Sequence, residues 1–501
     1  MESMTSVWFA THPAPHVAAR PFPEGSRFDT VVAGAGLTGL ATAALLARAG
    51  HRVAVVEARS VGAVATGNTT AKVSLLQGST LSDIRSHQSD EVLAAYVDGN
   101  REAQAWLARF LEERDIEFQS RTAYTFAFGG DGVSTLEDEL AACRAAGLTG
   151  VTWTTDTGLP FDVSGALALP DQLQIHPLVV LDALLEDLVE HGGVVIEGVR
   201  VTDAEVDSSV KVTTTAGGLE ADQLILATGT PILDRGGYFA KLEPHRSYAT
   251  TYRVPGAIPQ GMYLSVDGPG RSLRTVPVDD GELLMVGGNG HVVGRTDSEA
   301  AAVADLRRWT AEHFPGAEPT HAWSAQDYRA VDRVPYVGEL PRGEGRIFVA
   351  TGYNKWGMTN GVAAALMLSG RLLDGSMPWA DVLGERTPTS STLLSALAPN
   401  AKVAATLAKD WVQAEVGGLP DEPPAEGEGV VGRGPRGVPE AVSTVDGVTC
   451  RVSGICTHLG GVVRWNDAEK SWDCPLHGSR FAHDGSLLEG PAVADLPGSG
   501  G

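Results

Sequence analysis

FDTVVAGAGLTGLATAALLARAGHRVAVVEAR, residues 28–59, predicts a buried strand, a tight turn, an apolar helix and a second parallel strand. Gly34, Gly36 and Gly39 form a GxGxxG pattern at the turn, in the strand–turn–helix context that this pattern requires. These glycines permit the turn, the approach of a pyrophosphate to the helix N-terminus, and close helix–strand packing. Glu57 ends the second strand, where a carboxylate can accept hydrogen bonds from a ribose. The segment therefore predicts a Rossmann-type α/β fold that binds a dinucleotide.

Two later segments favour FAD over NAD. ADQLILATGT (221–230) ends a strand in Ala-Thr-Gly, and RIFVATGYNKWGMTNGVAAALMLSGRLL (346–373) is a strand, a Gly-rich turn and a long apolar helix. This arrangement resembles the glycine/D-amino-acid oxidase family of FAD-dependent oxidoreductases, in which the late turn faces the flavin pyrimidine ring. The TTAK stretch, residues 69–72, resembles a subgroup of that family that carries a C-terminal Rieske domain.

The motif and the resemblance together assign a set of residues to FAD. For Thr69, Thr70 and Lys72, helix capping is the alternative role. The full set is Gly34, Ala35, Gly36, Leu37, Thr38, Gly39, Glu57, Ala58, Thr69, Thr70, Lys72, Thr228, Gly229, Gly352, Lys355, Gly357 and Met358.

Near the end of the chain, CTHLGGVVRWNDAEKSWDCPLHG (456–478) holds two loops with one cysteine and one histidine each. Cys456, His458, Cys474 and His477 could hold zinc, although zinc knuckles usually pair like residues within a loop. One Cys and one His per loop suits a two-iron cluster with both thiolates on one iron and both imidazoles on the other. The stretch resembles the Rieske [2Fe–2S] domain, and the resemblance makes these four residues the cluster ligands.

The residues around this motif also predict the redox behaviour of the cluster. Gly461 and Leu476 stand where many respiratory Rieske proteins carry a disulfide, which implies a ferredoxin-like site. Ser479 matches a serine that hydrogen-bonds a sulfide, but Phe481 replaces a tyrosine with the same role. Because fewer hydrogen bonds to sulfur stabilise the reduced state less, we expect a potential below the respiratory type.

Charge and hydropathy exclude several partners and compartments. Acidic residues outnumber basic ones by 62 to 38, which argues against nucleic acids and anionic membranes as partners. No run of eighteen apolar residues occurs, so we expect no membrane span. The first residues lack a secretory signal, and the four cysteines do not form a disulfide framework, so we expect a cytoplasmic protein.

A chain of 501 residues is too long for one hydrophobic core. We expect an inserted α+β substrate domain within the flavin fold and a small all-β Rieske domain after it. The expected boundaries are a leader at 1–27, the flavin domain at 28–384 with substrate segments at about 100–170 and 237–335, helices and a linker at 385–427, and the Rieske domain at 428–501.

Two cofactors in one chain suggest an electron relay. We expect a dehydrogenase that oxidises a C–N bond of an amine or amino acid and drains FAD through the cluster to an external acceptor, such as a ferredoxin or quinone. Lys355, Arg246 and Tyr248 are the candidate catalytic residues, Arg246 as a clamp for a substrate carboxylate. An ion pair with one of the 62 acids is an alternative for Arg246.

Other functions remain open at this stage. The protein could be a non-enzymatic redox sensor or electron-transfer module, or an oxidase with a structural cluster. The sequence shows no second dinucleotide site, which argues against a nicotinamide reductase. It also has no pair of histidines five residues apart, which argues against a Rieske non-haem oxygenase.

Overall fold

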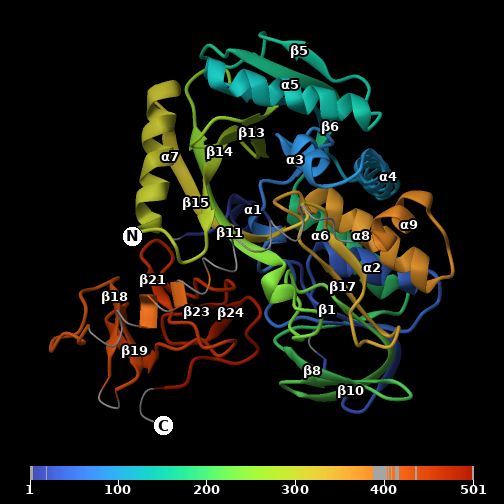
Figure 1. Ribbon diagram of the computed structural model, residues 1–501, viewed down its shortest axis with the longest axis vertical. Coiled ribbons are helices and arrows are strands. Elements are labelled where there is room, and N and C mark those ends of the chain that lie inside the picture. The colour runs from blue at the N-terminus through green and yellow to red at the C-terminus, as the bar shows by residue number, and fades with distance from the viewer. Residues whose placement is uncertain are drawn as a thin grey trace.

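The computed structural model describes residues 4–18, 20–386, 403, 406–407, 409–411, 417–434 and 437–498. Figure 1 shows a sheet with packed helices, a second sheet beside it, and a small all-β unit at one end. Hydrogen bonds join this unit to β11 (Leu242–Arg253) and α7 (Glu299–His313). More than half of the segment 385–427, where helices and a linker are expected, lies outside the described residues. None of the helices in the described part of the chain is long and apolar enough to cross a bilayer.

The first sheet is built around residues 28–59. β1 and β2 pair in parallel, and β2 is buried at every position, as expected for a strand of a sheet covered on both faces. The order across the sheet is β16 (Tyr336–Glu339), β17 (Ile347–Thr351), β10 (Gly217–Leu226), β1 (Arg27–Ala33), β2 (Val53–Val56) and β7 (Val194–Ile196), with β9 (Val210–Thr214) and β8 (Val201–Val206) continuing from β10.

Helices cover this sheet and join its core. The hydrophobic residues of α2 are buried on nearly every side, because α6 and α8 both pack against it. These helices are α2 (Leu37–Arg48), α4 (Asp90–Glu113), α6 (Pro177–Glu190), α8 (Gly357–Leu372) and α9 (Pro378–Glu385).

The second sheet draws on both expected substrate segments and on a short strand before them. Its strands in order are β15 (Glu318–Ala330), β11 (Leu242–Arg253), β14 (Gly281–Val292), β13 (Arg271–Val278), β12 (Met262–Ser265), β4 (Gln119–Ala127), β6 (Gly165–Gln174) and β3 (Lys72–Val73), with β5 (Thr152–Thr154) on β6. Three further helices accompany this part of the chain: α3 (Thr80–His87), α5 (Gly130–Ala145) and α7 (Glu299–His313).

The C-terminal unit consists of two small antiparallel sheets. One contains β18 (Gly429–Arg433), β19 (Pro439–Val445) and β20 (Val448–Ser453); the other contains β21 (Arg464–Asn466), β22 (Ser471–Asp473), β23 (Arg480–Ala482) and β24 (Leu487–Glu489). Trp472 and Phe481 are fully buried in its core, beside Cys456 and Cys474.

The N-terminal segment is more than the unpatterned leader expected from the sequence. It forms a short helix, α1 (Val7–Thr11), and Trp8 is only 1% exposed. The indole Nε1 of Trp8 donates to the carbonyl of Thr69 at 2.7 Å, and the guanidinium of Arg274 lies over its ring. The segment therefore supports the loop that holds the TTAK stretch.

Candidate functional site

Three loops meet at the carboxyl edge of the first sheet. β1, β10 and β17 are parallel neighbours, so the residues that follow them lie side by side. Residues 34–39 follow β1, residues 228–229 follow β10, and residues 352–358 follow β17, while Glu57 follows β2 on the other side of β1. Ligands of open α/β sheets bind in the crevice outside this edge, which is where the sequence predicts the flavin to lie.

The glycine turn is too tight for side chains. Gly34 has a left-handed φ of +105°, and a Cβ added there would stand 2.5 Å from the carbonyl oxygen of Ala227. A Cβ on Gly39 would stand 1.9 Å from the carbonyl oxygen of Gly34. The local geometry therefore requires glycine at both positions, as the tight turn and close helix–strand packing of a dinucleotide-binding motif do.

The N-termini of α2 and α8 lie together beside this turn. The hydroxyls of Thr38 and Tyr353 hydrogen-bond at 2.9 Å, and a Cβ on Gly361 would come within 2.8 Å of the Thr38 hydroxyl. Helix N-termini carry partial positive charge. Such a pair suits the pyrophosphate of FAD and the anionic form of its reduced ring.

Glu57 closes the crevice next to β1. Its carboxylate accepts hydrogen bonds from the backbone N–H groups of Ala35 and Arg59, both at 2.8 Å. Burial raises the pKa of Glu57 above its usual value, and the two backbone donors oppose that rise. The side chain is thus held rigidly at the end of β2, where a ribose hydroxyl would meet it.

Lys355 reaches from the turn between β17 and α8 towards the second sheet. Its backbone N–H donates to the carboxylate of Asp327. Its Nζ lies 2.5 Å from the place of a Cβ on Gly290, and the hydroxyl of Ser247 lies 2.8 Å from the same point. Although more than a third of Lys355 is exposed, the surrounding protein desolvates the amine and lowers its pKa.

A bulge in β11 shapes the floor beneath Lys355. The pairing of β11 with β14 shifts register between Arg246 and Tyr248, and bulges of this kind redirect side chains. The Ser247 hydroxyl is buried and makes no hydrogen bond to the described residues. The hydroxyl of Tyr248 pairs with Nε2 of His291 at 3.0 Å. A polar substrate group would satisfy the Ser247 hydroxyl here.

Two expected roles need correction. Arg246 does not await a substrate carboxylate: it is 2% exposed, and its guanidinium is paired with Glu469 and Glu489. Lys72 does not lie at the carboxyl edge of the first sheet, because its Nζ donates into the second sheet, to the carbonyl of Tyr263 at 3.2 Å and to the Ser272 hydroxyl. Burial lowers the pKa of Lys72 to about 7.

The remaining predicted flavin residues take part in local contacts. Thr69 and Thr70 lie in the loop supported by Trp8 and Arg274, and each offers its backbone carbonyl. The Thr228 hydroxyl donates to the carbonyl of Thr230 at 2.6 Å, and Met358 is buried at the start of α8. Their contacts to FAD stay predictions.

The two cysteine–histidine loops come together in the C-terminal unit. The Cys456 and Cys474 thiols share a hydrogen bond, which lowers the pKa of the Cys456 thiol to about 7. The rings of His458 and His477 lie 5.2 Å apart, and Nδ1 of His458 is buried with no hydrogen-bond partner among the described residues. A cysteine pair beside a histidine pair is the donor set of a two-iron cluster, so the residues fit that group.

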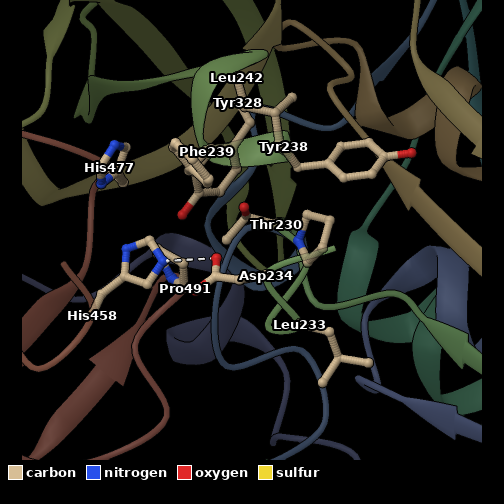
Figure 2. Close-up of a pocket in the computed structure, with 11 residues that line it drawn as sticks. Thr230, Leu233, Asp234, Tyr238, Phe239, Leu242, Tyr328, His458, His477 and Pro491 are labelled. Carbon is tan, nitrogen blue, oxygen red and sulfur yellow. Dashed lines mark hydrogen bonds and ion pairs between the residues drawn. The ribbon is translucent and has the colours of Figure 1, made fainter. Parts of the chain in front are cut away.

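Both histidines face the N-terminal part of the protein, which contains the first and second sheets. They line a pocket with residues that follow β10 and with Tyr328 of β15 (Figure 2). The ring of Phe239 meets the ring of His477 edge-on at 5.6 Å. Nε2 of His458 lies 3.3 Å from the carboxylate of Asp234.

A buried ion-pair network fixes this contact. Arg246 donates to Glu469 twice at 2.6 Å and to Glu489 at 3.2 Å. The hydroxyl of Ser324 also donates to Glu469, at 2.7 Å. Arg480 completes the network from the side of the C-terminal unit, 3.1 Å from Glu469 and 2.7 Å from Glu489.

Comparison with known proteins identifies both parts. A model of the FAD dependent oxidoreductase (DAO) family matches residues 29–371, and a model of the Rieske [2Fe-2S] domain matches residues 428–498. The chain belongs to the FAD dependent oxidoreductase (DAO) family. It therefore binds FAD and, in its C-terminal domain, a [2Fe–2S] cluster rather than zinc.

Relatives of this DAO-family protein share the arrangement in whole or in part. YhfW of Bacillus subtilis (strain 168), named as a Rieske 2Fe-2S iron-sulfur protein, is 32% identical over 479 residues, covering 94% of this chain and 93% of that protein. Glycine oxidase from Geobacillus kaustophilus superposes with a TM-score of 0.59 at 20% identity, covering 70% of this chain and 96% of that one. L-proline dehydrogenase from P. horikoshii superposes with a TM-score of 0.58 at 18% identity, covering 73% of this chain and 100% of that one. These two structures support the fold.

Sequence analysis missed the residues that join the domains of this DAO-family protein. Asp234, Gln326 and Glu469 are not among the residues to which the motifs assign a role, and each is separated from its partner in the other domain by more than a hundred residues. Polar and charged residues of this kind are usually solvated, so the sequence offered no signal for their interdomain contacts.

Proposed function

We propose that this protein is a dehydrogenase that oxidises a C–N bond of a small amine or amino acid and passes the electrons through its Rieske cluster to an external acceptor. The observation that carries the proposal is the docked position of His458 and His477, the two imidazole ligands, against the flavin domain. FAD, when bound, takes up a hydride, and the cluster carries one electron at a time. An oxidase would have no need of such a contact, because reduced flavin reacts directly with oxygen.

Tyr328 connects the two sites within the protein. Its backbone carbonyl accepts from the N–H of Asn354 in the predicted flavin-facing turn, and its ring packs near Gly229. Its hydroxyl accepts from Gln326 at 2.9 Å, and the same amide nitrogen of Gln326 donates to the carbonyl of Gly478 at 2.7 Å. Gly478 directly follows His477, so a short bonded path leads from the flavin turn to a cluster ligand.

The substrate would bind between Lys355 and the bulge of β11. Removal of hydride from an amine depends mainly on orientation and on a neutral amine. The unpaired hydroxyl of Ser247 and the pair of Tyr248 with His291 offer polar groups that can orient it. The names of the two structural neighbours, a glycine oxidase and a proline dehydrogenase, favour an amino acid or a related amine.

A cytoplasmic location also belongs to this proposal. All four cysteines are free thiols, two of them the predicted cluster ligands, and unpaired cysteines are typical of a reducing compartment. The external acceptor would then be a cytoplasmic carrier such as a ferredoxin, or a quinone at a membrane surface.

The test is an anaerobic titration of the holoprotein with amines, N-methylated amino acids and D-amino acids. Flavin absorbance and the EPR signal of the cluster are followed together. Bleaching of the flavin followed by a Rieske-type signal supports the relay and gives the substrate class. Bleaching without that signal means an oxidase with a structural cluster, and no bleaching by any compound favours a redox module or another electron donor.

A pair of variants separates chemistry from folding. Lys355→Met should slow flavin bleaching by about tenfold or more, because an oriented polar group is lost. Lys211→Met, on the exposed side of β9, should behave as wild type. Equal rates in both variants would remove Lys355 from the proposed site.

A further inference from the structure

Asp234 of the flavin domain touches a ligand of the iron–sulfur cluster. It lies in the loop that follows the Ala-Thr-Gly end of β10, and its carboxylate is 3.3 Å from Nε2 of His458 (Figure 2). The side chain of His458 is 7% exposed, whereas that of Asp234 is 55% exposed. The other ring nitrogen of His458, Nδ1, is buried and has no hydrogen-bond partner within the part of the chain that the structure describes. The hydrogen bond on Nε2 thus leaves Nδ1 as the nitrogen that would bind iron.

The two histidines have different neighbours. His477 meets the ring of Phe239 edge-on, which is an apolar contact. In the contacts drawn in Figure 2, His458 but not His477 is paired with a carboxylate of the flavin domain. A carboxylate that accepts from an imidazole N–H makes the imidazole a stronger electron donor to its metal. Stronger donation stabilises the oxidised metal and disfavours its reduction.

We propose that Asp234 is a positioning residue that lowers the reduction potential of the cluster, and that it does so only while the Rieske domain is docked on the flavin domain. The partner of the cluster ligand then belongs to the electron-donating domain itself. Docking and potential are thereby linked, and an undocked Rieske domain is the stronger oxidant.

The ion-pair network holds the Rieske domain in the position in which Asp234 meets His458. Arg246 of the flavin domain pairs with Glu469 and Glu489 of the Rieske domain, and Arg246 is almost fully buried. The carbonyl of Pro475, in the second ligand loop, accepts from Arg295 of the flavin domain at 3.0 Å. Rotation of the Rieske domain would therefore break several contacts together with the one to Asp234.

The experiment is a redox titration of the full-length holoprotein with dithionite, followed by the EPR signal of the cluster, for wild type and three variants. Asp234→Asn keeps an oxygen acceptor but removes the charge. Glu344→Gln removes an acid that lines the same surface hollow as Asp234 and makes no contact with His458 among the described residues. Arg246→Met weakens docking.

Asp234→Asn should favour the reduced cluster by about tenfold, which is about 59 mV for a one-electron couple. Arg246→Met should shift the potential in the same direction, and Glu344→Gln should leave it close to wild type. Equal shifts in Asp234→Asn and Glu344→Gln would overturn the proposal, because they would show a general charge effect. A shift in Arg246→Met alone would also overturn it, since docking would then act without Asp234. No substrate is added, so the outcome does not depend on the C–N chemistry proposed above.

Discussion

Replacement of Arg246 by methionine tests whether the Rieske domain is held in one position. Methionine keeps much of the volume of the side chain and removes its charge. The guanidinium is 2% exposed and holds Glu469 and Glu489 of the other domain. The substitution leaves both carboxylates buried with one guanidinium, that of Arg480, in place of two.

Two lines of reasoning give the size of the effect. Removal of one partner from a buried ion pair costs about 3–5 kcal/mol, and the lower end applies here because Arg480 remains. The electrostatics of Glu469 agree: burial would raise its pKa, but Arg246 and Arg480 together lower it to about 2 from 4.5. That shift is what remains after the opposing effect of burial, and it corresponds to about 3 kcal/mol, so the two guanidiniums and the Ser324 hydroxyl together contribute more than this. A loss of about 3 kcal/mol reduces the docking equilibrium by about 100-fold.

Hydrogen exchange of the holoprotein measures this loss. Peptides that cover β11 and residues 467–481 should exchange up to about 100-fold faster in Arg246→Met, while peptides of β1 and β2 should not change. Arg253→Met is the matched control on the same strand, because its pair with Asp280 is exposed and is expected to contribute less than about 1 kcal/mol. Identical exchange in the two variants would refute a docking role for the buried network.

Four further predictions follow from single side chains. Because the pKa of Glu469 is lowered in the docked state, its contribution to docking stability is complete above about pH 4.5 and is lost as the pH falls towards 2. Hydrogen exchange at the interface should therefore accelerate over that pH range in wild type and much less in Glu469→Gln. Trp8→Ala should lower the free energy of unfolding by about 3–5 kcal/mol in denaturant titrations and weaken FAD retention, contrary to what a dispensable leader would do. Gly34→Ala should abolish or strongly weaken FAD binding in absorbance measurements, whereas Gly130→Ala, with open space around it, should bind FAD normally. Cys456→Ser should eliminate the EPR signal of the cluster but keep the flavin spectrum, and a surviving signal would contradict the ligand assignment.

The parts of the site that lie close together in sequence were predictable. The turn from Gly34 to Gly39 and the two ligand loops each carry their chemistry within a few residues, so spacing indicates a dinucleotide turn and a paired Cys/His site, and the family resemblance then names FAD and the two-iron cluster. The fold followed as well, because buried strands end just before residues 34, 228 and 352, and the first and third of them lead through a Gly-rich turn into an apolar helix. The family comparisons confirm the FAD fold and the Rieske domain.

The contacts between domains were not predictable for a physical reason. Arg246 meets Glu469 across 223 residues, and nothing local distinguishes that acid from the other 61. The stretch around Trp8 forms a helix of only five residues, which is too short to show a helical period. In both cases tertiary packing decides the role, and packing leaves no periodic pattern in the sequence.

The strand order of the first sheet has a consequence for synthesis of the chain. β1 is flanked by β2 and β10, and β10 in turn needs β17, so strands at residues 27–33, 217–226 and 347–351 must meet. At translation rates of about 5–20 residues per second, the ribosome needs roughly 15–60 s to make β17 after β1. In the first part of that interval the apolar edge of β1 has no partner, because β10 has not been made. Afterwards β10 is present, but β17 is still missing and the sheet is incomplete. The nascent protein is therefore exposed to aggregation for much of its synthesis, and its yield in cells should depend on chaperones that bind unpaired strands.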